Sequence, residues 1–392
     1  MGGKYLKNKP VTAIKPTNKK KKWKVVVLSI FLLLIVLICG VVAFFWSKLD
    51  LIEYDNEVNY DVYRETTSQQ ITDSEQTGEM SGTDQEPQEE QVQEEAEDNI
   101  DISGLEMVET APVIPESEVF EDANVLNILV IGTDERTKNF DTNARSDCMI
   151  LVSIDRERNT VKLVSLERGI AAPILEGMYA GGHDWLTHIF RYGGAELLRK
   201  TVEHCFKVDV DHYVRFNFTS VTNVIDAIGG VDINLTNREA MGLNGQIATN
   251  ARTKHPMKEG VNHVDGYDAL QYARIRYIDS DWQRIERQRK LILAVVDALK
   301  NANLLELNNL ANTVLPMVQT NLSKLEIAEL VLYAPNFLKS EFDQMTIPKE
   351  GTYGGMGCIQ GRGGFAVDYE INNDLLHRFL YEGATSEELL AE

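Results

Sequence analysis

The chain has 392 residues, with 60 acidic and 39 basic side chains and a formal net charge of −21. An acidic excess of this size argues against nucleic acid as a general partner. Four cysteines at irregular spacing suit neither a disulfide framework nor a zinc site. Cys39 falls in the apolar N-terminal stretch, so one disulfide among Cys148, Cys205 and Cys358 stays open.

The N-terminal region predicts a membrane anchor. Residues 25–46 run for 22 positions without a charge, and as a helix they would extend roughly 33 Å, enough to cross a hydrocarbon core. A cleaved signal peptide is the alternative, but its apolar region is usually shorter and ends in small residues, whereas Phe44, Phe45 and Trp46 close this one. Nine lysines and no acidic residue precede the span, so residues 1–24 are expected in the cytoplasm. We therefore expect a single-pass protein of the cell membrane whose C-terminal part is extracellular.

The interval 47–123 predicts an acidic, flexible linker. No lysine or arginine occurs between Arg64 and Arg136, and residues 73–101 alone hold twelve Asp or Glu. A segment so rich in charge and so poor in aromatics cannot bury enough apolar surface to fold by itself. It would serve as a tether that lets the outer domain work at different heights above the membrane, or as an inert spacer.

Residues 124–383 predict one α/β domain, with a C-terminal tail at 384–392. Its pattern alternates buried strands with amphipathic helices, which indicates a central mixed β-sheet covered by helices on both faces. Strands are expected at 125–133, 148–154, 160–166, 212–217 and 231–235, the second and third joined as a hairpin, and helices at 194–206 and 220–230. Residues 236–264 are polar and irregular, and the glycine-rich stretch 351–364 reads as a loop.

Charged residues gather where three of these strands end. Asp134 follows the first strand, Arg145 and Asp147 stand at the start of the second, and Arg168 follows the third. If the first strand is antiparallel to the second, all of these ends meet at one edge of the sheet. Carboxylates beside arginines suit a magnesium ion shared with phosphate oxygens. Structural ion pairs that cap the strand ends are the alternative.

A second basic cluster lies in QYARIRYIDSDWQRIERQRK, residues 271–290. Arg274 and Arg276 are two residues apart, so in an extended segment both would point the same way. Arg284, Arg287 and Gln288 follow at helical spacing, on one face of the next helix. A solvated helix face would explain the later basic residues, but not the two that directly follow the apolar pattern ALQYA. The stretch therefore favours a site for a polyanion, which arginine binds in two-point fashion.

Several familiar catalytic patterns are missing from the sequence. It contains no GxxxxGK[ST] phosphate loop, no GxSxG nucleophile elbow and no HExxH metal pair. The seven histidines are scattered, and His188 is expected to be structural. A mechanism without a covalent nucleophile is therefore favoured.

Three separated segments resemble one known family. They are NILVIGTDERTKNFDTNARSDCMILVSIDRERNTVKLVSLER, HYVRFNFTSVTNVIDAIGGVDINL and GYDALQYARIRYIDSDWQRIERQRK, which are similar to the LytR–CpsA–Psr family of membrane-anchored bacterial wall-assembly enzymes. The resemblance implies a transferase that moves a teichoic acid, capsular polysaccharide or related glycopolymer from a polyprenyl-pyrophosphate carrier to a peptidoglycan hydroxyl. In such a transfer the hydroxyl attacks the sugar-side phosphorus and polyprenyl phosphate leaves.

The resemblance also implies roles for individual residues. Asp134 and Asp147 would hold Mg²⁺ and, with Arg168, would form the catalytic set. The residues expected to contact or approach the pyrophosphate are Arg145, Arg168, Arg274, Arg276, Arg284, Arg287 and Gln288.

One departure from the family pattern concerns Arg168. Family members usually carry Arg-Asp at this point, whereas this chain reads Arg168-Gly169. The missing carboxylate could orient the arginine or help to deprotonate the acceptor. A non-catalytic envelope protein that binds the lipid carrier or regulates wall assembly is therefore the alternative function.

Overall fold

The computed structural model describes residues 46–55, 102–109, 113–134, 144–300, 311–337, 339–358 and 362–392. The chain divides into two compact units, Met1–Asp50 and Leu51–Glu392, and the second contains every element discussed below. Among the described residues, no helix is both long and apolar enough to cross a membrane. Apart from Trp46, the span predicted at 25–46 lies outside those residues, as does the acidic centre of the predicted linker.

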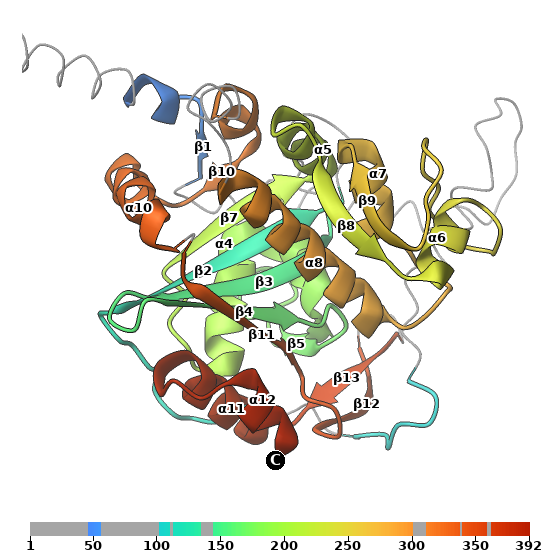
Figure 1. Cartoon of the computed structure of the whole chain (residues 1–392). Coiled ribbons are helices and arrows are strands. Elements are labelled where there is room, and N and C mark those ends of the chain that lie inside the picture. Colours follow the sequence, from blue (N-terminus) through green and yellow to red (C-terminus); the bar gives the residue numbers. More distant parts are fainter. Residues whose placement is uncertain are drawn as a thin grey trace, which may run out of the picture. The chain divides into compact units, whose positions relative to one another are not determined.

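A mixed sheet forms the centre of the second unit (Figure 1). Within the described residues it has seven strands, in the order β1 (Glu53–Tyr54), β10 (Gln319–Thr320), β7 (His212–Asn217), β2 (Val125–Thr133), β3 (Ser146–Asp155), β4 (Thr160–Leu166) and β11 (Glu341–Ile347). β2 runs parallel to β7 and antiparallel to β3, while β4 runs antiparallel to β3 and parallel to β11. The prediction of a mixed sheet is confirmed, as is the hairpin between the second and third predicted strands.

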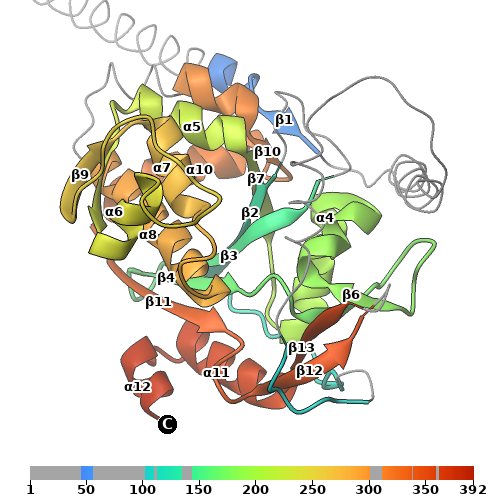
Figure 2. The same ribbon diagram turned by 90° about the vertical axis from the view of Figure 1, so that its right-hand side faces the viewer.

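Helices cover both faces of this sheet, as predicted (Figure 2). On one face lie α4 (Leu186–Phe206) and α11 (Tyr369–Tyr381), where Phe190 and Leu376 pack in one core with Leu151 and Val164. On the other face lie α8 (Asp281–Lys300) and α10 (Lys324–Phe337). α4 begins eight residues before the helix predicted at 194–206, because it continues across a kink at the adjacent glycines 193 and 194.

A smaller cluster of elements packs beside α8. It contains α5 (Phe218–Ala227), β8 (Val231–Leu235), α6 (Asn237–Leu243), β9 (Gly260–Val264) and α7 (Gly266–Ala273), and it has its own apolar core. The helix and strand predicted here are confirmed, but the segment 236–264 is not irregular throughout. A capping box between Thr236 and Glu239 starts α6, and β9 pairs with β8. Gly266 lets α7 approach α5 closely, because a Cβ there would lie 2.1 Å from the carbonyl oxygen of Thr222.

The remaining elements are two short hairpins, a 3₁₀ turn and a short helix, of which the helix lies beyond the predicted end of the domain at residue 383. In the hairpins, β5 (Ala171–Pro173) pairs with β6 (His183–Trp185), and β12 (Tyr353–Gly357) pairs with β13 (Gly363–Val367). The 3₁₀ turn is at Leu315–Met317, and the helix is α12 (Ser386–Ala391). The glycine-rich stretch 351–364 is thus largely a hairpin rather than a loop. Its glycines allow residues 102–109 to pack against it, since a Cβ on Gly354 would lie 2.7 Å from the carbonyl oxygen of Glu106.

The ends of the predicted linker and the predicted tail also contact the domain. At the start of the 47–123 interval, β1 pairs with β10, and near its end Phe120 forms a bridge with Val208. The residues after 383 are not a free tail, because α12 buries Leu389 in the core beneath the sheet. These contacts could not be predicted from composition, because each of them involves only a few apolar residues.

Candidate functional site

The strand ends that carry Asp134, Arg145, Asp147 and Arg168 meet at one edge of the central sheet. β2 and β3 pair antiparallel, so that Thr133 at the end of one lies opposite Ser146 at the start of the other. β3 pairs antiparallel with β4, which brings the end of β4 to the same edge. The predicted convergence of these four residues is therefore confirmed as a matter of topology.

Asp134 and Arg145 form a close pair across this edge. The Oδ1 atom of Asp134 accepts the backbone N–H of Arg145 at 2.8 Å, and its Oδ2 atom accepts the Nε–H at 2.8 Å. The backbone N–H of Asp134 donates to the carbonyl oxygen of Arg145 at 3.2 Å. This part of the site is thus held by the two strand ends themselves, as the ion-pair alternative expected.

Arg168 lies between two carboxylates and an aromatic ring. Its Nε donates to Oδ2 of Asp281 at 3.0 Å, and its Nη1 is 4.0 Å from Oδ1 of Asp147. The guanidinium carbon also lies 5.7 Å from the ring centre of Trp185, a cation–π distance. Asp281, the first residue of α8, was not among the predicted site residues. Its position three residues before Arg284 was the available signal, because such pairs meet on a helix.

Arg284 joins α8 to the start of β3. Its side chain is buried, its Nη2 donates to the backbone oxygen of Asp147 at 3.1 Å, and its Nη1 lies 3.5 Å from Oδ1 of Asp281. Gln288 lies one turn further along the same face of α8 and contributes to the same cavity. The helix therefore presents two of the predicted residues to the sheet edge.

A small cavity, with room for about one water molecule and partly open to solvent, lies among these groups. Its apolar wall includes Met149, Leu166 and Ile285. Its charged and amide-bearing walls come from Asp147, Glu167, Arg168, Asp281, Arg284 and Gln288. The cavity thus combines residues from β3, from the end of β4 and from α8.

The arginines dominate the electrostatics of the cavity. Burial alone would raise the pKa of Asp147, but the guanidinium groups of Arg284, Arg145, Arg168 and Arg276 hold it far below its usual range. Burial would also raise the pKa of Asp281, but the nearby guanidinium groups, first of all that of Arg284, lower it to about 2. Desolvation, followed by repulsion from Arg284 and Arg168, lowers the pKa of the Arg276 guanidinium to about 10. At Arg276 the repulsion by Arg284 and Arg168 is larger than the attraction by Asp147 and Asp281, and it adds to the effect of burial.

Two predicted residues lie elsewhere. Arg287 is buried against Asp279, to which its guanidinium donates two hydrogen bonds of 2.7 and 2.8 Å, and it also donates to the backbone oxygen of Ile275. Arg274 lies over the ring of Phe218, with its guanidinium carbon 4.9 Å from the ring centre. The segment after α7 is not extended, because Arg274 caps that helix in an α-helical conformation. The prediction that Arg274 and Arg276 point the same way is therefore wrong in its premise.

Glu167 is a site residue that the sequence did not single out. Its side chain is completely buried, and its Oε2 accepts the backbone N–H of Gly169. Its Oε1 has no hydrogen-bond partner among the described residues. Burial and the nearby charge of Asp281 raise the pKa of Glu167 to about 7. Strand alternation was the available signal, since Val161 and Leu163 on β4 also face the α8 side.

His188 sits beneath the site without contacting the cavity. It is buried, its ring stacks on that of Trp185, and its Nδ1 lies 3.2 Å from Asp184. Burial lowers the pKa of His188 despite this carboxylate. The residue thus supports Trp185, on which Arg168 rests, and this is a structural role.

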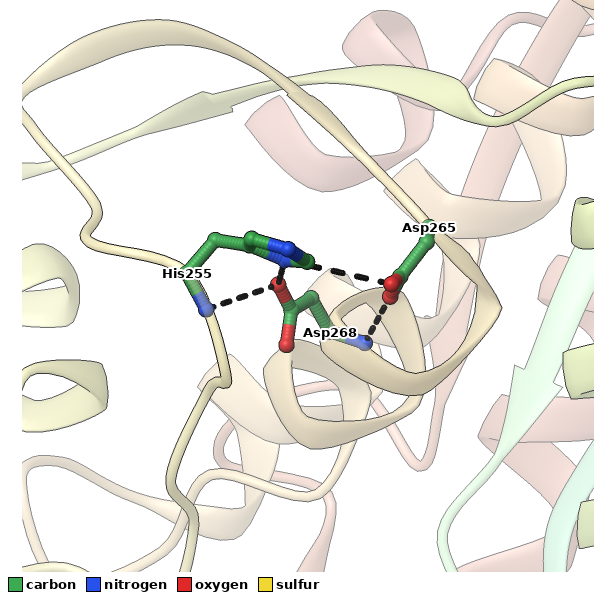
Figure 3. A group of neighbouring side chains, drawn as sticks. All are labelled: His255, Asp265 and Asp268. Atoms are coloured by element: carbon green, nitrogen blue, oxygen red, sulfur yellow. Dashed lines mark hydrogen bonds and ion pairs between the residues drawn. The ribbon is translucent and has the colours of Figure 1, made fainter.

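His255, Asp265 and Asp268 form a separate group at the start of α7 (Figure 3). Asp265 caps the helix by accepting the N–H of Asp268 at 2.9 Å. Asp268 accepts the N–H of Lys254 at 2.7 Å, and its other oxygen is 2.7 Å from Nδ1 of His255. These contacts fasten the preceding loop to α7, so capping accounts for the group.

The three described cysteines are thiols. Cys205 is fully buried, while Cys148 and Cys358 are partly exposed. Burial raises the pKa of each to about 12, which leaves them as unreactive thiols near neutral pH.

Comparison with known proteins identifies the family to which this site belongs. The model of the LytR_cpsA_psr family matches residues 71–370. The chain belongs to this family. The match spans the sheet edge, the cavity and α8, so the arginine-rich site is part of the family domain.

Relatives with assigned names are teichoic acid transferases. The chain is 30% identical over 223 residues to the polyisoprenyl-teichoic acid–peptidoglycan teichoic acid transferase TagT of Bacillus subtilis (strain 168), covering 56% of this chain and 67% of the relative. It is 28% identical over 229 residues to the corresponding transferase TagU of Bacillus cereus (strain ATCC 14579), covering 58% and 69%.

Solved structures share the fold. TagT bound to LIIa-WTA aligns with a TM-score of 0.53 at 24% identity, covering 72% of this chain and 97% of that one. The family protein YwtF (TagT) with bound octaprenyl pyrophosphate lipid aligns with a TM-score of 0.50 at 22% identity, covering 69% and 96%. At these identities the structures support the LytR_cpsA_psr fold of the domain.

Proposed function

We propose that the protein is a phosphotransferase that attaches a glycopolymer, such as a teichoic acid or capsular polysaccharide, from a polyprenyl-pyrophosphate carrier to a peptidoglycan hydroxyl. The family membership and the names of the relatives support a transferase role. The product would be a phosphodiester, and the leaving group would be polyprenyl phosphate.

One observation supports this proposal above the others. The guanidinium groups of Arg168 and Arg284 line the cavity, and that of Arg276 lies close enough for both of them to repel it. Cations held this close raise the electrostatic free energy of the folded protein unless an anion binds between them. A diphosphate head group supplies two charged phosphates in one compact unit. Bidentate contacts to phosphate oxygens would offset the mutual repulsion of the arginines.

A magnesium ion fits the same edge of the site. The Oδ1 atom of Asp147 is buried and finds no hydrogen-bond partner among the described residues, which suits a hard cation. Asp134 is the second candidate ligand, and it would have to relax its contacts with Arg145. We propose these two carboxylates as the ligands. When bound, the ion would neutralise charge on the phosphate oxygens.

The residues of the chain itself would act by position and charge. Arg168 is held by Asp281 and Trp185, so its guanidinium enters the cavity in a fixed orientation. Arg284 is similarly held between β3 and α8. Pre-oriented cations of this kind stabilise the charge that develops on the transferring phosphoryl group without reorganisation during the reaction.

The location of the reaction also belongs to this proposal. The apolar run at 25–46 and the lysines before it would anchor the protein in the cell membrane, with the domain on the outer side. That side offers peptidoglycan as the acceptor and the membrane-bound carrier as the donor. Nucleic acid is not a proposed partner.

The test uses the full-length protein in detergent with a polyprenyl-pyrophosphate saccharide, peptidoglycan oligomers and Mg²⁺. We expect release of polyprenyl phosphate that depends on the metal and on the acceptor, and that falls at least about a hundredfold in Arg168→Gln. Arg199→Gln serves as the matched control, because Arg199 is bound by Glu196 and Glu203 on α4, away from the cavity. No release with any acceptor would contradict the proposal.

Gly169 favours a second candidate, a protein that binds the lipid carrier without turning it over. Glycine provides no carboxylate at the position after Arg168, so binding of the carrier would be retained while deprotonation of the acceptor would lose that group. Gly169→Asp distinguishes the two functions. A large gain in turnover at unchanged affinity for the carrier would favour the binding function, whereas an active wild type would favour the transferase.

A further inference from the structure

The proposed transfer releases one proton for each phosphodiester formed, so a group near the reacting hydroxyl has to accept it. The carboxyl groups that line the cavity are those of Asp147, Asp281 and Glu167. Burial disfavours the charge of the two aspartates, but neighbouring guanidinium groups outweigh it and keep their pKa values low. Carboxylates stabilised in this way are weak bases near neutral pH, which makes neither of them suitable.

Glu167 has the geometry that the aspartates lack. One of its oxygens accepts the N–H of Gly169, while the other is buried and has no hydrogen-bond partner among the described residues, and the residue itself lines the cavity. A buried polar atom in such a position is normally satisfied by water when the cavity is polar and large enough. The cavity has both polar and apolar walls and is partly open to solvent, so it can admit a water molecule or a hydroxyl group.

The surroundings of Glu167 favour proton uptake near neutral pH. The groups that face it are Asp281 and Arg284 on α8, Arg168 at the end of its own strand, Asp147 across the cavity on β3, and Tyr353 on β12. Burial and the charge of Asp281 favour the protonated acid, and the two arginines oppose it. The balance leaves the pKa of Glu167 near 7, which suits a group that must take up and release a proton in each cycle.

We propose that Glu167 is the general base of the transfer and accepts the proton of the acceptor hydroxyl through one water molecule in the cavity. This inference rests on the proposed function. The hydroxyl oxygen bonds to the sugar-side phosphorus while the bond from that phosphorus to the bridging oxygen breaks. The electron pair of the broken bond leaves with polyprenyl phosphate. The hydroxyl proton passes to the water, and a proton of that water passes to Oε1 of Glu167.

The substitution Glu167→Gln isolates this role. Glutamine keeps the size of the side chain and an oxygen that accepts the N–H of Gly169, and it loses only the capacity to take up a proton. Glu286→Gln is the matched control, because Glu286 lies on α8, pairs with Lys290 at 2.7 Å and is half-buried away from the cavity lining.

The experiment measures release of polyprenyl phosphate by the full-length wild type and both variants in detergent between pH 5.5 and 8.5. We expect the wild-type rate to rise about tenfold per pH unit below about pH 7 and to level off above it. Glu167→Gln should lose about 10²- to 10⁴-fold in rate, and its residual rate should not follow the wild-type pH profile. Its affinity for a polyprenyl pyrophosphate should stay within about threefold of wild type.

Two results would overturn the role of Glu167 while leaving the transferase proposal intact. One is a Glu167→Gln protein with wild-type rates, and the other is a wild-type profile without an inflection between pH 6 and 8.5. The second needs no variant, so poor folding of Glu167→Gln would not protect the inference. No release by the wild type at any pH would overturn both proposals.

Discussion

Replacing Glu167 with glutamine should stabilise the folded protein, increasingly so as the pH rises. The pKa of Glu167 is about 7 in the folded protein against an ordinary value of 4.5, so the folded state binds the proton more tightly than the unfolded chain does. The contribution of the protonated Glu167 to the free energy of unfolding is therefore fully present below pH 4.5 and is lost as the pH rises through 7. A difference of about 2.5 pH units corresponds to about 3 kcal/mol. Glutamine carries no charge at any pH and avoids this loss.

Urea unfolding at pH 5, 6, 7 and 8 measures the effect, with Glu286→Gln as the control. The advantage of Glu167→Gln over wild type should grow by about 2–3 kcal/mol between pH 5 and pH 8, most of it before pH 7. The control should show no such trend. An advantage that is the same at every pH, or a loss of stability at pH 8, would refute the assignment of a buried carboxyl that titrates near neutrality.

Three further predictions concern the arginines and their partners. Arg284→Gln should slow transfer by at least about a hundredfold, because it removes a buried cation from the cavity, and steady-state kinetics would measure it. Arg287→Gln should lower the free energy of unfolding by about 3 kcal/mol through loss of the Asp279 pair, while the rate per folded molecule stays unchanged. The Asp281 carboxylate stabilises the folded protein only while it is ionised, by about 1–2 kcal/mol after solvent screening. Asp281→Asn should therefore reduce the loss in free energy of unfolding that the wild type shows as the pH falls from about 4 to about 2, as urea unfolding would measure.

The convergence of Asp134, Arg145, Asp147 and Arg168 could be predicted because it depends on strand order alone. Buried strands are continuous apolar runs, a short polar turn forces an antiparallel hairpin, and antiparallel pairing decides which strand ends meet. Each of these signals is local. The elements at 236–264 were missed because β9 is short and three of its five residues are polar or exposed, so it lacks the apolar run of a buried strand.

Local spacing places Arg287, Asp281 and Glu167 on a face of a helix or strand, but it does not decide what that face contacts. α8 packs against the sheet on one side and against the smaller α5–α7 cluster on the other, so it has two inward faces rather than one. Arg284 and Gln288 belong to the first face, and Arg287 belongs to the second. The spacing of three and four residues along the helix does not reveal which of these side chains belongs to which face. The contact of Asp281 with Arg168 and the electrostatic effect of Asp281 on Glu167 join segments more than a hundred residues apart, which only the folded chain brings together.

The affinity of the arginine cluster beside the cavity, Arg168, Arg276 and Arg284, for a diphosphate tests the central claim most directly. Titration calorimetry on the full-length protein would compare farnesyl pyrophosphate with farnesyl phosphate, in the wild type, in Arg276→Gln and in the control Arg199→Gln. We expect the diphosphate to bind at least about tenfold more tightly than the monophosphate, and Arg276→Gln to lose at least about tenfold while the control does not. Equal affinity for the two ligands, or an Arg276→Gln protein that binds as the wild type does, would contradict the claim that these arginines form a diphosphate site.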